Sequence, residues 1–283
     1  MRSKQKFQNG FRRALCYLFL IAMSWIMIYP LLWMFFGAFK SNSELFGNMA
    51  LLPKAWDLSG FSKGWKGSGF VSYTDYFINT FKMTIPCIVL GILSSILVAY
   101  GFARFQFVGK KLCFTLMIAT MLLPGTTMII PRYILFNQIG WLDTYWPFIA
   151  PMAFATVAFN NFMLITFFRD IPKSIDEAAT IDGANSWQIL TKIFVPLSKT
   201  SIVSIGLFIF IGNWNNFFEP LIYISSQKKY TLPLALQMTF NQAQVEWNRA
   251  LAMSFCAVVP LVLLFLFAQK YFIEGIATTG IKE

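Results

Sequence analysis

The sequence of 283 residues contains no histidine, so it lacks the side chain that proteins use most often as a proton shuttle and metal ligand near neutral pH. Charged residues make up only 12% of the chain, whereas soluble domains average about 25%. The phosphate-binding pattern G-x-x-x-x-G-K-[S/T] and the nucleophile elbow G-x-S-x-G are both missing. These absences predict a chain that is not an enzyme and that carries no metal or other cofactor of its own.

Cysteine is also scarce, and no two cysteines form a C-x-x-C pair. Each of the four lies in or beside an apolar run. That placement predicts small packed hydrophobic side chains and argues against disulfides or metal ligands. The four are Cys16, Cys87, Cys113 and Cys256.

Long apolar runs dominate the rest of the chain, which is 57% hydrophobic. A helix needs about 20 apolar residues to cross the hydrocarbon layer of a membrane, and six runs approach or exceed that length. We therefore expect an all-α, polytopic membrane protein with six transmembrane helices. The predicted spans are residues 14–39, 83–103, 112–130, 145–168, 201–223 and 250–268.

Basic residues predict how these spans are oriented. The net charge is +11, and the segment before the first span is basic without an acidic residue. Because cytoplasmic loops are enriched in lysine and arginine, we expect both termini and the segment 171–200 in the cytoplasm and the loop 40–82 outside. That loop, rich in glycine and aromatic residues, is either a plain surface loop or a landing surface for a soluble partner. A signal peptide is the competing interpretation of the N-terminus, but its apolar run is too long and lacks a small-residue cleavage site.

The predicted cytoplasmic segment between the fourth and fifth spans differs from both spans and loops. Ser174 and Glu177 have the spacing of a capping box that starts a helix, and Gly183 predicts the end of that helix. Asn185 and Gln188 repeat the spacing of the cap. Apolar residues then recur at steps of three and four, which predicts a second, amphipathic helix after a sharp bend. Its apolar face comprises Trp187, Leu190, Phe194 and Leu197. Such a unit needs a partner surface.

Polar side chains are costly inside a membrane span and tend to face a bundle interior or an aqueous path. The fourth and fifth predicted spans contain Asn160, Asn161, Asn213, Asn216 and Glu219. One interpretation is hydrogen bonding between helices, which stabilises membrane bundles. We prefer the other, in which these residues line a path for a solute, because aromatic residues lie beside the amides and this combination suits a sugar.

The spacing within 171–200 resembles the EAA signature of the membrane subunits of binding-protein-dependent ABC importers. The matching residues are Glu177, Ala178 and Ala179, then Asp182, Gly183 and Ala184, then Ile193, Pro196 and Leu197. From about residue 14 to the C-terminus the chain is similar to the carbohydrate-importer branch, specifically to MalG-like permease subunits. Supporting segments are 99–105, 121–125, 168–172, 214–217 and 271–282.

The resemblance implies a type I ABC importer permease fold, with one transmembrane permease domain over residues 1–283 in the bacterial cell membrane. It implies that 171–200 is a coupling helix pair seated in a cleft of a cytoplasmic ATPase, with Glu177 facing a basic group and Gly183 setting the docking angle. The other implied coupling residues are Ala178, Ala179, Asp182, Ala184 and Trp187. The tail 270–283 either frays or reaches into the ATPase dimer interface.

The implied function is that of a permease subunit in an ATP-driven, binding-protein-dependent importer of a sugar or oligosaccharide. Its implied partners are a second homologous permease subunit, an ATPase dimer that holds ATP and magnesium, an extracellular solute-binding protein, the carbohydrate substrate and membrane lipid, with no nucleic acid. The alternatives are the same machinery for a peptide, polyamine or phosphonate, an ion-coupled secondary carrier, or a non-transporting membrane scaffold. A carrier should contain titratable groups within the membrane, and this sequence offers only Glu219, near the end of a span.

Overall fold

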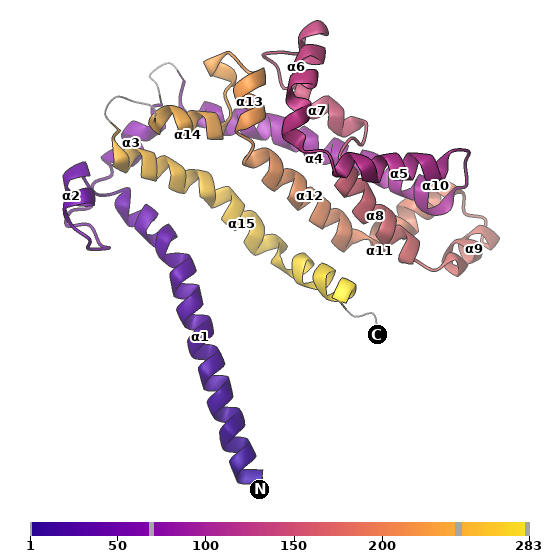
Figure 1. The fold of residues 1–283 in the computed structure, drawn as a ribbon, viewed down its shortest axis with the longest axis horizontal. Helices are drawn as coiled ribbons and strands as arrows, with labels where there is room; N and C mark the ends of the chain where they lie inside the picture. The colour runs from indigo at the N-terminus through magenta and orange to yellow at the C-terminus, as the bar shows by residue number, and fades with distance from the viewer. Residues whose placement is uncertain (1, 68–70, 241–244, 281–283) are drawn as a thin grey trace. The chain divides into compact units, whose positions relative to one another are not determined.

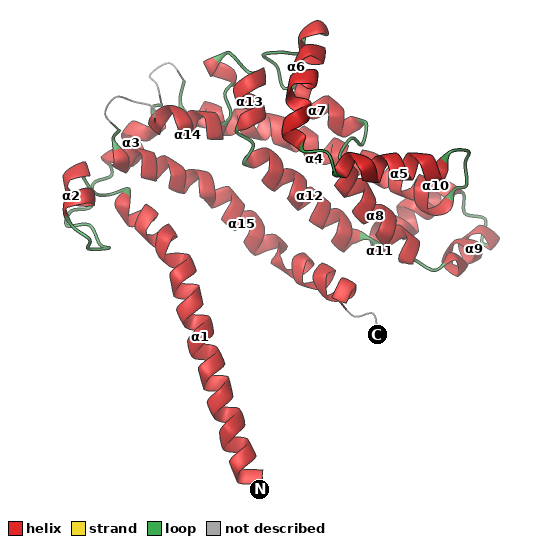
Figure 2. Ribbon diagram, viewed as in Figure 1, coloured by secondary structure: helices red, strands yellow, loops and turns green. Residues whose placement is uncertain are grey.

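The computed structural model describes residues 2–67, 71–240 and 245–280, and every regular element in those ranges is a helix (Figure 2). The all-α prediction is therefore confirmed. The chain divides into two compact units, residues 1–72 with 236–260 and residues 73–235 with 261–283. The helix α15 (Trp247–Gly280) contributes its first part to one unit and its second part to the other. A single permease domain over the whole chain stays a prediction.

The first unit is built from α1, two short helices and the beginning of α15 (Figure 1). Both short helices are attached to α15, because the N–H of Trp247 donates to Oδ1 of Asn42 in α2 at 3.0 Å and Arg249 donates from Nη2 to the carbonyl of Gly67, just after α3, at 2.6 Å. None of the most apolar 18-residue window of α1 is buried against the described chain. That helix therefore offers its apolar surface to lipid or to another subunit. The helices are α1 (Arg2–Gly37), α2 (Asn42–Gly47) and α3 (Ser59–Trp65).

The second unit is organised around α4 (Tyr73–Arg104), which packs against α7, α8 and α12. The remaining helices are α5 (Lys110–Met121), η1 (Gly125–Met128), α6 (Ile129–Gln138), α7 (Trp146–Ala153), α8 (Ala158–Asp170), α9 (Lys173–Ile181), α10 (Ser186–Ile189), η2 (Leu190–Phe194), α11 (Val195–Leu197), α12 (Lys199–Trp214), α13 (Phe218–Tyr223) and η3 (Gln227–Lys229). The short helix α14 (Leu232–Phe240) begins in this unit and ends in the first.

Small side chains on α4 let its neighbours approach closely. A Cβ atom added to Gly91 would lie 2.8 Å from Cδ1 of Ile209 on α12. Ser94 donates from Oγ to the carbonyl of Met152 on α7 at 2.6 Å. Small residues and hydroxyl bonds of this kind are what hold membrane helices together, since lipid removes most of the hydrophobic driving force between them. They make α4 the centre of the unit.

The loop before α7 is fixed by Asp143. Its carboxylate accepts hydrogen bonds from the backbone of Ser225 and Ser226 and from Nζ of Lys229, the last at 2.8 Å. Burial acts to raise the pKa of Asp143, but the hydrogen bonds from Lys229, Ser226 and Ser225 outweigh burial and hold that pKa below its usual range. The carboxylate therefore stays ionised at neutral pH and joins this loop to the segment after α13.

Four helical stretches of the described chain are long and apolar enough to cross a membrane, and the number rises to six if each of two bent pairs counts as one span. The membrane prediction is confirmed, while the count of six stays a prediction. The four stretches are Arg12–Gly37, Tyr73–Arg104, Trp146–Asp170 and Trp247–Lys270. The bent pairs are Lys110–Met121 with Gly125–Gln138, at 102°, and Ser186–Leu197 with Lys199–Trp214, at 77°.

Two details differ from expectation. The predicted fifth span is interrupted, because α12 ends at Trp214 and α13 begins only at Phe218. All four cysteines are free thiols; Cys87 is buried as predicted, Cys256 is half-buried, and Cys16 and Cys113 are exposed within the chain. The predicted tail is helical to Gly280, whereas residues 281–283 and the side chains from residue 271 onward lie outside the described part.

Candidate functional site

The bent segment, residues 171–200, leaves the bundle after α8 and returns to it at α12. Pro172 occupies the N-cap position of the first helix, α9, and no side chain accepts a hydrogen bond from the first N–H groups of that helix. The predicted capping box of Ser174 and Glu177 is therefore wrong, because the helix already begins at Lys173 and both residues lie inside it. Within the described residues the side chain of Glu177 makes no hydrogen bond or ion pair and is exposed, so its carboxylate is available to a partner.

The bend itself matches the prediction. Gly183 has φ of +79°, a conformation that residues with a Cβ rarely adopt. The N–H of Ala184 donates to the carbonyl of Ala179 at 2.9 Å, and the N–H of Gly183 donates to Thr180 at 3.1 Å, which closes a Schellman motif. Nothing lies within 4 Å of a Cβ built on Gly183, so backbone conformation alone requires glycine here.

The second helix starts as predicted, with a reciprocal capping box. The side chain of Asn185 accepts from the N–H of Gln188, and the side chain of Gln188 accepts from the N–H of Asn185, both at 2.9 Å. The first four N–H groups of a helix have no partner within it, and this capping box satisfies two of them while fixing the entry of the chain. The turn between the two helices of the bent segment is therefore determined by local residues.

Phe194 fastens the second helix to the bundle. Its fully buried ring packs edge to face against Tyr100 at the end of α4 and against Phe168 at the end of α8, with both centroid distances at 5.1 Å. Leu190 is buried beside it, whereas Trp187 and Leu197 are exposed. Half of the predicted apolar face therefore packs on the span ends, and the other half is left open.

Arg104, the last residue of α4, ties both helices of the bent segment to one span. It forms a salt bridge with Asp176 on α9 and donates from Nη2 to the carbonyl of Ile171 at 2.7 Å. Its guanidinium also lies 4.7 Å from the centre of the Phe194 ring. The sequence did not identify the roles of Arg104 and Asp176, and residue 104 was noted only within the segment 99–105. The signal that could have indicated this ion pair was a basic residue, Arg104, at the end of a predicted span, together with acidic residues in the short helix of the bent segment.

The predicted coupling residues form a mostly exposed surface. Ile181, which the sequence analysis did not single out, joins them with 87% of its surface exposed, and Trp187 is 64% exposed. Large apolar side chains left open on short helices outside the apolar spans indicate an interaction surface. Of the predicted residues, Glu177, Ala178, Asp182, Gly183 and Trp187 are exposed, Ala184 is half-buried and Ala179 is buried.

Four of the five predicted path residues line one pocket of about 330 Å³. The aromatic rings of Phe159 and Phe208 complete its wall. The polar residues are Asn160, Asn213, Asn216 and Glu219. Asn161 stays apart, since its Nδ2 donates to the carbonyl of Ala155 at 2.6 Å and braces the turn between α7 and α8.

Glu219 is the charged centre of this pocket. Its Oε2 accepts from Nδ2 of Asn216 at 2.8 Å, and its Oε1 lies 3.4 Å from Nη1 of Arg132. A neighbouring cavity of about 580 Å³ shares Asn213 and Glu219. Amide and carboxylate groups beside aromatic faces can hydrogen-bond a hydroxyl-rich solute while its apolar faces contact the rings. No group of three or more potential metal ligands occurs among the residues described.

Three comparisons place the chain among known proteins. Residues 60–277 match the family model described as binding-protein-dependent transport system inner membrane component. The probable ABC transporter permease protein YurM of Bacillus subtilis is 32% identical over 94% of this chain and 86% of its own length. The arabinooligosaccharides transport system permease protein AraQ of Halalkalibacterium halodurans is 30% identical over 92% of this chain and 93% of its own.

A solved structure shares the fold. The chain superposes with a TM-score of 0.82 on one from the crystal structure of a bacterial ABC transporter involved in the import of the acidic polysaccharide alginate. The alignment covers 94% of this chain and 98% of the other. The sequence identity is 22%, so this likeness concerns the fold.

Proposed function

The chain belongs to the family of binding-protein-dependent transport system inner membrane components, and from that membership we propose that it is the permease subunit of an ATP-driven sugar or oligosaccharide importer. It is a transport subunit and not an enzyme, because family members of this kind are permeases that work with a separate ATPase. The observation that carries the proposal is the bent segment, whose exposed face is open to a partner while its root is fixed to two spans by Arg104 and Phe194.

The proposed location is the cytoplasmic membrane of a bacterium, with both termini and the bent segment on the cytoplasmic side. The basic residues in the first turns of α1, at the end of α4 and at the start of α5 support that orientation. An ATPase dimer that binds ATP and magnesium would dock on the bent segment, and a second permease subunit would complete the translocation path. An external solute-binding protein would deliver the substrate. The described part of the predicted outer loop, residues 40–67 and 71–82, has exposed residues on which that protein would dock.

The coupling mechanism follows from how the bent segment is attached. Movement of the ATPases displaces α9 and α10, and Glu177 and Trp187 supply contacts that the ATPase can make differently in its two states. The ion pair and ring contacts of Arg104 and Phe194 pass the displacement to the cytoplasmic ends of α4 and α8. The spans then change between inward-open and outward-open arrangements.

A sugar is the solute class that the pocket and the relatives support best. Asn160, Asn213 and Asn216 offer amide donors and acceptors beside Phe159 and Phe208. One relative is named for arabinooligosaccharide transport. Peptides, polyamines and phosphonates stay as alternatives. An ion-coupled carrier is not favoured, because the family is described by binding-protein-dependent transport and a relative is named an ABC transporter permease.

The Glu177→Lys variant tests the proposal in the complete assembly. Reversal of the charge on the docking face should reduce uptake of a labelled oligosaccharide by more than about tenfold, since tenfold corresponds to only about 1.4 kcal/mol of coupling. ATP hydrolysis should continue. Uptake is scored against a panel of labelled oligosaccharides, peptides and polyamines.

Glu246→Lys is the matched control, because Glu246 is exposed, lies in the other unit and receives the same change of charge. It should leave uptake within about twofold of the wild type. Undiminished uptake in Glu177→Lys would overturn the coupling assignment, and uptake of peptides or polyamines alone would overturn the sugar assignment.

A further inference from the structure

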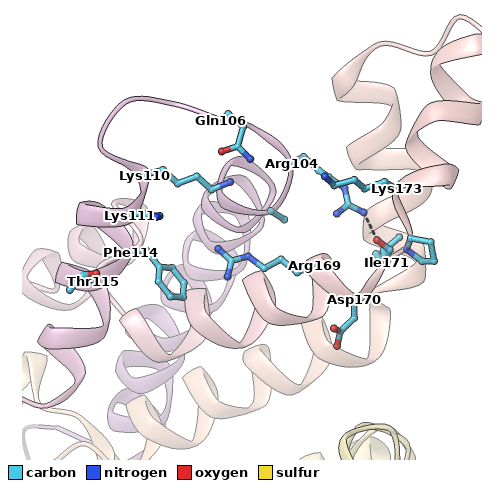
Figure 3. A pocket seen from close by; sticks show the side chains of 12 residues that line it. Arg104, Gln106, Lys110, Lys111, Phe114, Thr115, Arg169, Asp170, Ile171 and Lys173 are labelled. Carbon is cyan, nitrogen blue, oxygen red and sulfur yellow. Dashed lines mark hydrogen bonds between the residues drawn. The ribbon is translucent and has the colours of Figure 1, made fainter. Parts of the chain in front are cut away.

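A third cavity lies where the bent segment joins the bundle, and it shares no lining residue with the two cavities that contain Asn213 and Glu219. It has a volume of about 630 Å³ and is formed where α4 and α8 end and where α5 and α9 begin. Ligand sites typically fall between about 300 and 1,000 Å³. Its lining residues are Ala103, Arg104, Gln106, Lys110, Lys111, Phe114, Thr115, Arg169, Asp170, Ile171, Pro172 and Lys173. Figure 3 shows Arg104, Lys110 and Arg169 around the same space.

The lining is strongly basic, with five cationic side chains and one carboxylate, that of Asp170. Arg104 already has a counter-charge in Asp176. Among the described residues the other four cations form no salt bridge with an acidic side chain. These four are Lys110, Lys111, Arg169 and Lys173. Four cations gathered in one cavity without acidic partners favour an anion from outside the chain.

Two of these cations are held in place by other contacts. Nζ of Lys110 donates to the carbonyl of Phe105 at 2.7 Å, which leaves further N–H groups of the ammonium for a ligand. The guanidinium of Arg169 lies 4.8 Å from the centre of the Phe114 ring. A guanidinium stacked on an aromatic face keeps its edge available for the oxygens of a phosphate group. The cavity is therefore arranged before any anion arrives.

The surroundings of the pocket indicate an amphiphilic ligand. Leu112 and Leu116 stand one turn apart on α5, beside Lys111 and Thr115, and are 63% and 56% exposed. Phe105, at the end of α4, is 48% exposed. Basic pockets at the ends of membrane helices bind the head groups of anionic lipids, and an adjoining apolar surface accommodates acyl chains. A free phosphate ion would use only the basic half of this arrangement.

We propose that this pocket binds the phosphate head group of an anionic membrane phospholipid, with the acyl chains along the exposed face of α5. The proposal depends on the membrane location of the chain and not on which solute it transports. It assigns to Lys110 and Arg169 the contacts to phosphate oxygens, and to Leu112 and Leu116 the contacts to hydrocarbon.

The test uses the protein purified in detergent with the subunits that accompany it from its native membrane. Binding of spin-labelled phosphatidylglycerol is titrated, with phosphatidylcholine of the same chains as the zwitterionic reference. The variant carries Lys110→Gln with Arg169→Gln, and Lys192→Gln with Lys199→Gln is the control, because those two exposed lysines lie on the same bent segment outside the pocket. Both variants lose two positive charges.

Phosphatidylglycerol should bind the wild type more tightly than phosphatidylcholine does. The pocket variant should weaken that binding by about ten- to thirtyfold, as expected for the loss of two basic contacts, and the control by less than about twofold. Arg169→Lys, which keeps the charge but loses the stacking on Phe114, should lose less affinity than the pocket variant. Equal losses in the pocket and control variants, or no preference for the anionic lipid, would overturn the proposal.

Competition with inorganic phosphate and with glycerol 1-phosphate distinguishes a lipid head group from a free phosphate ion as the bound anion. Millimolar amounts of either should leave the bound phosphatidylglycerol in place. Complete displacement by inorganic phosphate would assign the pocket to a free anion. If a lysine-directed cross-linker joins Lys110 to an accompanying protein, the pocket would instead be assigned to a protein contact.

Discussion

At the scale of single residues, Arg104 determines how the bent segment is held. Its guanidinium contacts Asp176 on α9, the carbonyl of Ile171 and the ring of Phe194. The side chains of the ion pair are only 9% and 19% exposed. Removal of one partner from such a shielded pair leaves an uncompensated charge, which costs far more than the loss of an exposed pair.

We predict that Asp176→Asn lowers the free energy of unfolding by about 2–4 kcal/mol, because Arg104 loses its counter-charge. The measurement is denaturant unfolding of the purified protein in detergent micelles. Glu177→Gln is the neighbouring control, and its exposed, unpaired carboxylate should contribute less than about 0.5 kcal/mol. Equal losses in the two variants would show that the ion pair does not hold the bent segment.

The five polar span residues separate into two roles that mutation can distinguish. Asn213→Ala removes an amide from the pocket wall and should raise the apparent KM for the imported solute by about two- to tenfold, with only a modest loss of stability because its Nδ2 also donates to the carbonyl of Ile209, one turn back in the same helix, at 2.9 Å. Asn161→Ala removes a brace on the carbonyl of Ala155 and should lower the unfolding midpoint with KM unchanged. Uptake kinetics and thermal unfolding check both variants, and the reverse pattern would contradict the assignment.

At the scale of elements, the angle between α9 and α10 depends on one glycine. We predict that Gly183→Ala destabilises the bend by about 1–2 kcal/mol, since an L residue is forced into the left-handed region without any steric clash. The amount of solute taken up per ATP hydrolysed should also fall in this variant. Gly125→Ala is the control, because Gly125 also faces open space but has no positive φ. If both variants behave alike, the bend does not set the docking angle.

Local chemistry made part of the bent segment predictable. The turn at Gly183 and the box of Asn185 with Gln188 depend on residues a few positions apart, so the pattern identified both. The start of α9 was mispredicted because the spacing of Ser174 and Glu177 fits a cap, while Pro172 already occupies that position. The salt bridge of Arg104 could not be predicted, because its partner comes from a separate helix and depends on tertiary packing.

At the scale of the whole molecule, length and hydrophobicity were sufficient to predict a helical membrane protein. They were not sufficient to predict where helices break. The third predicted span bends by 102° next to Pro124, and the fifth is entered through a bend of 77° that includes the buried Ser198. The length and hydrophobicity of an apolar run do not locate such a break. The exposed apolar surface of α1 likewise points to neighbours outside this chain.

The central claim is that the bent segment docks on a separate ATPase. A photo-cross-linking amino acid placed at Trp187, which is 64% exposed, tests it directly in native membranes. The same group at the fully exposed Met49, on the predicted outer side, is the control.

After illumination, mass spectrometry should identify an adduct between position 187 and an ATP-binding protein that contains the phosphate-binding loop missing from this chain. No such adduct should form at position 49. Cross-links from position 187 to lipid alone, or to the ATPase equally from both positions, would contradict the account.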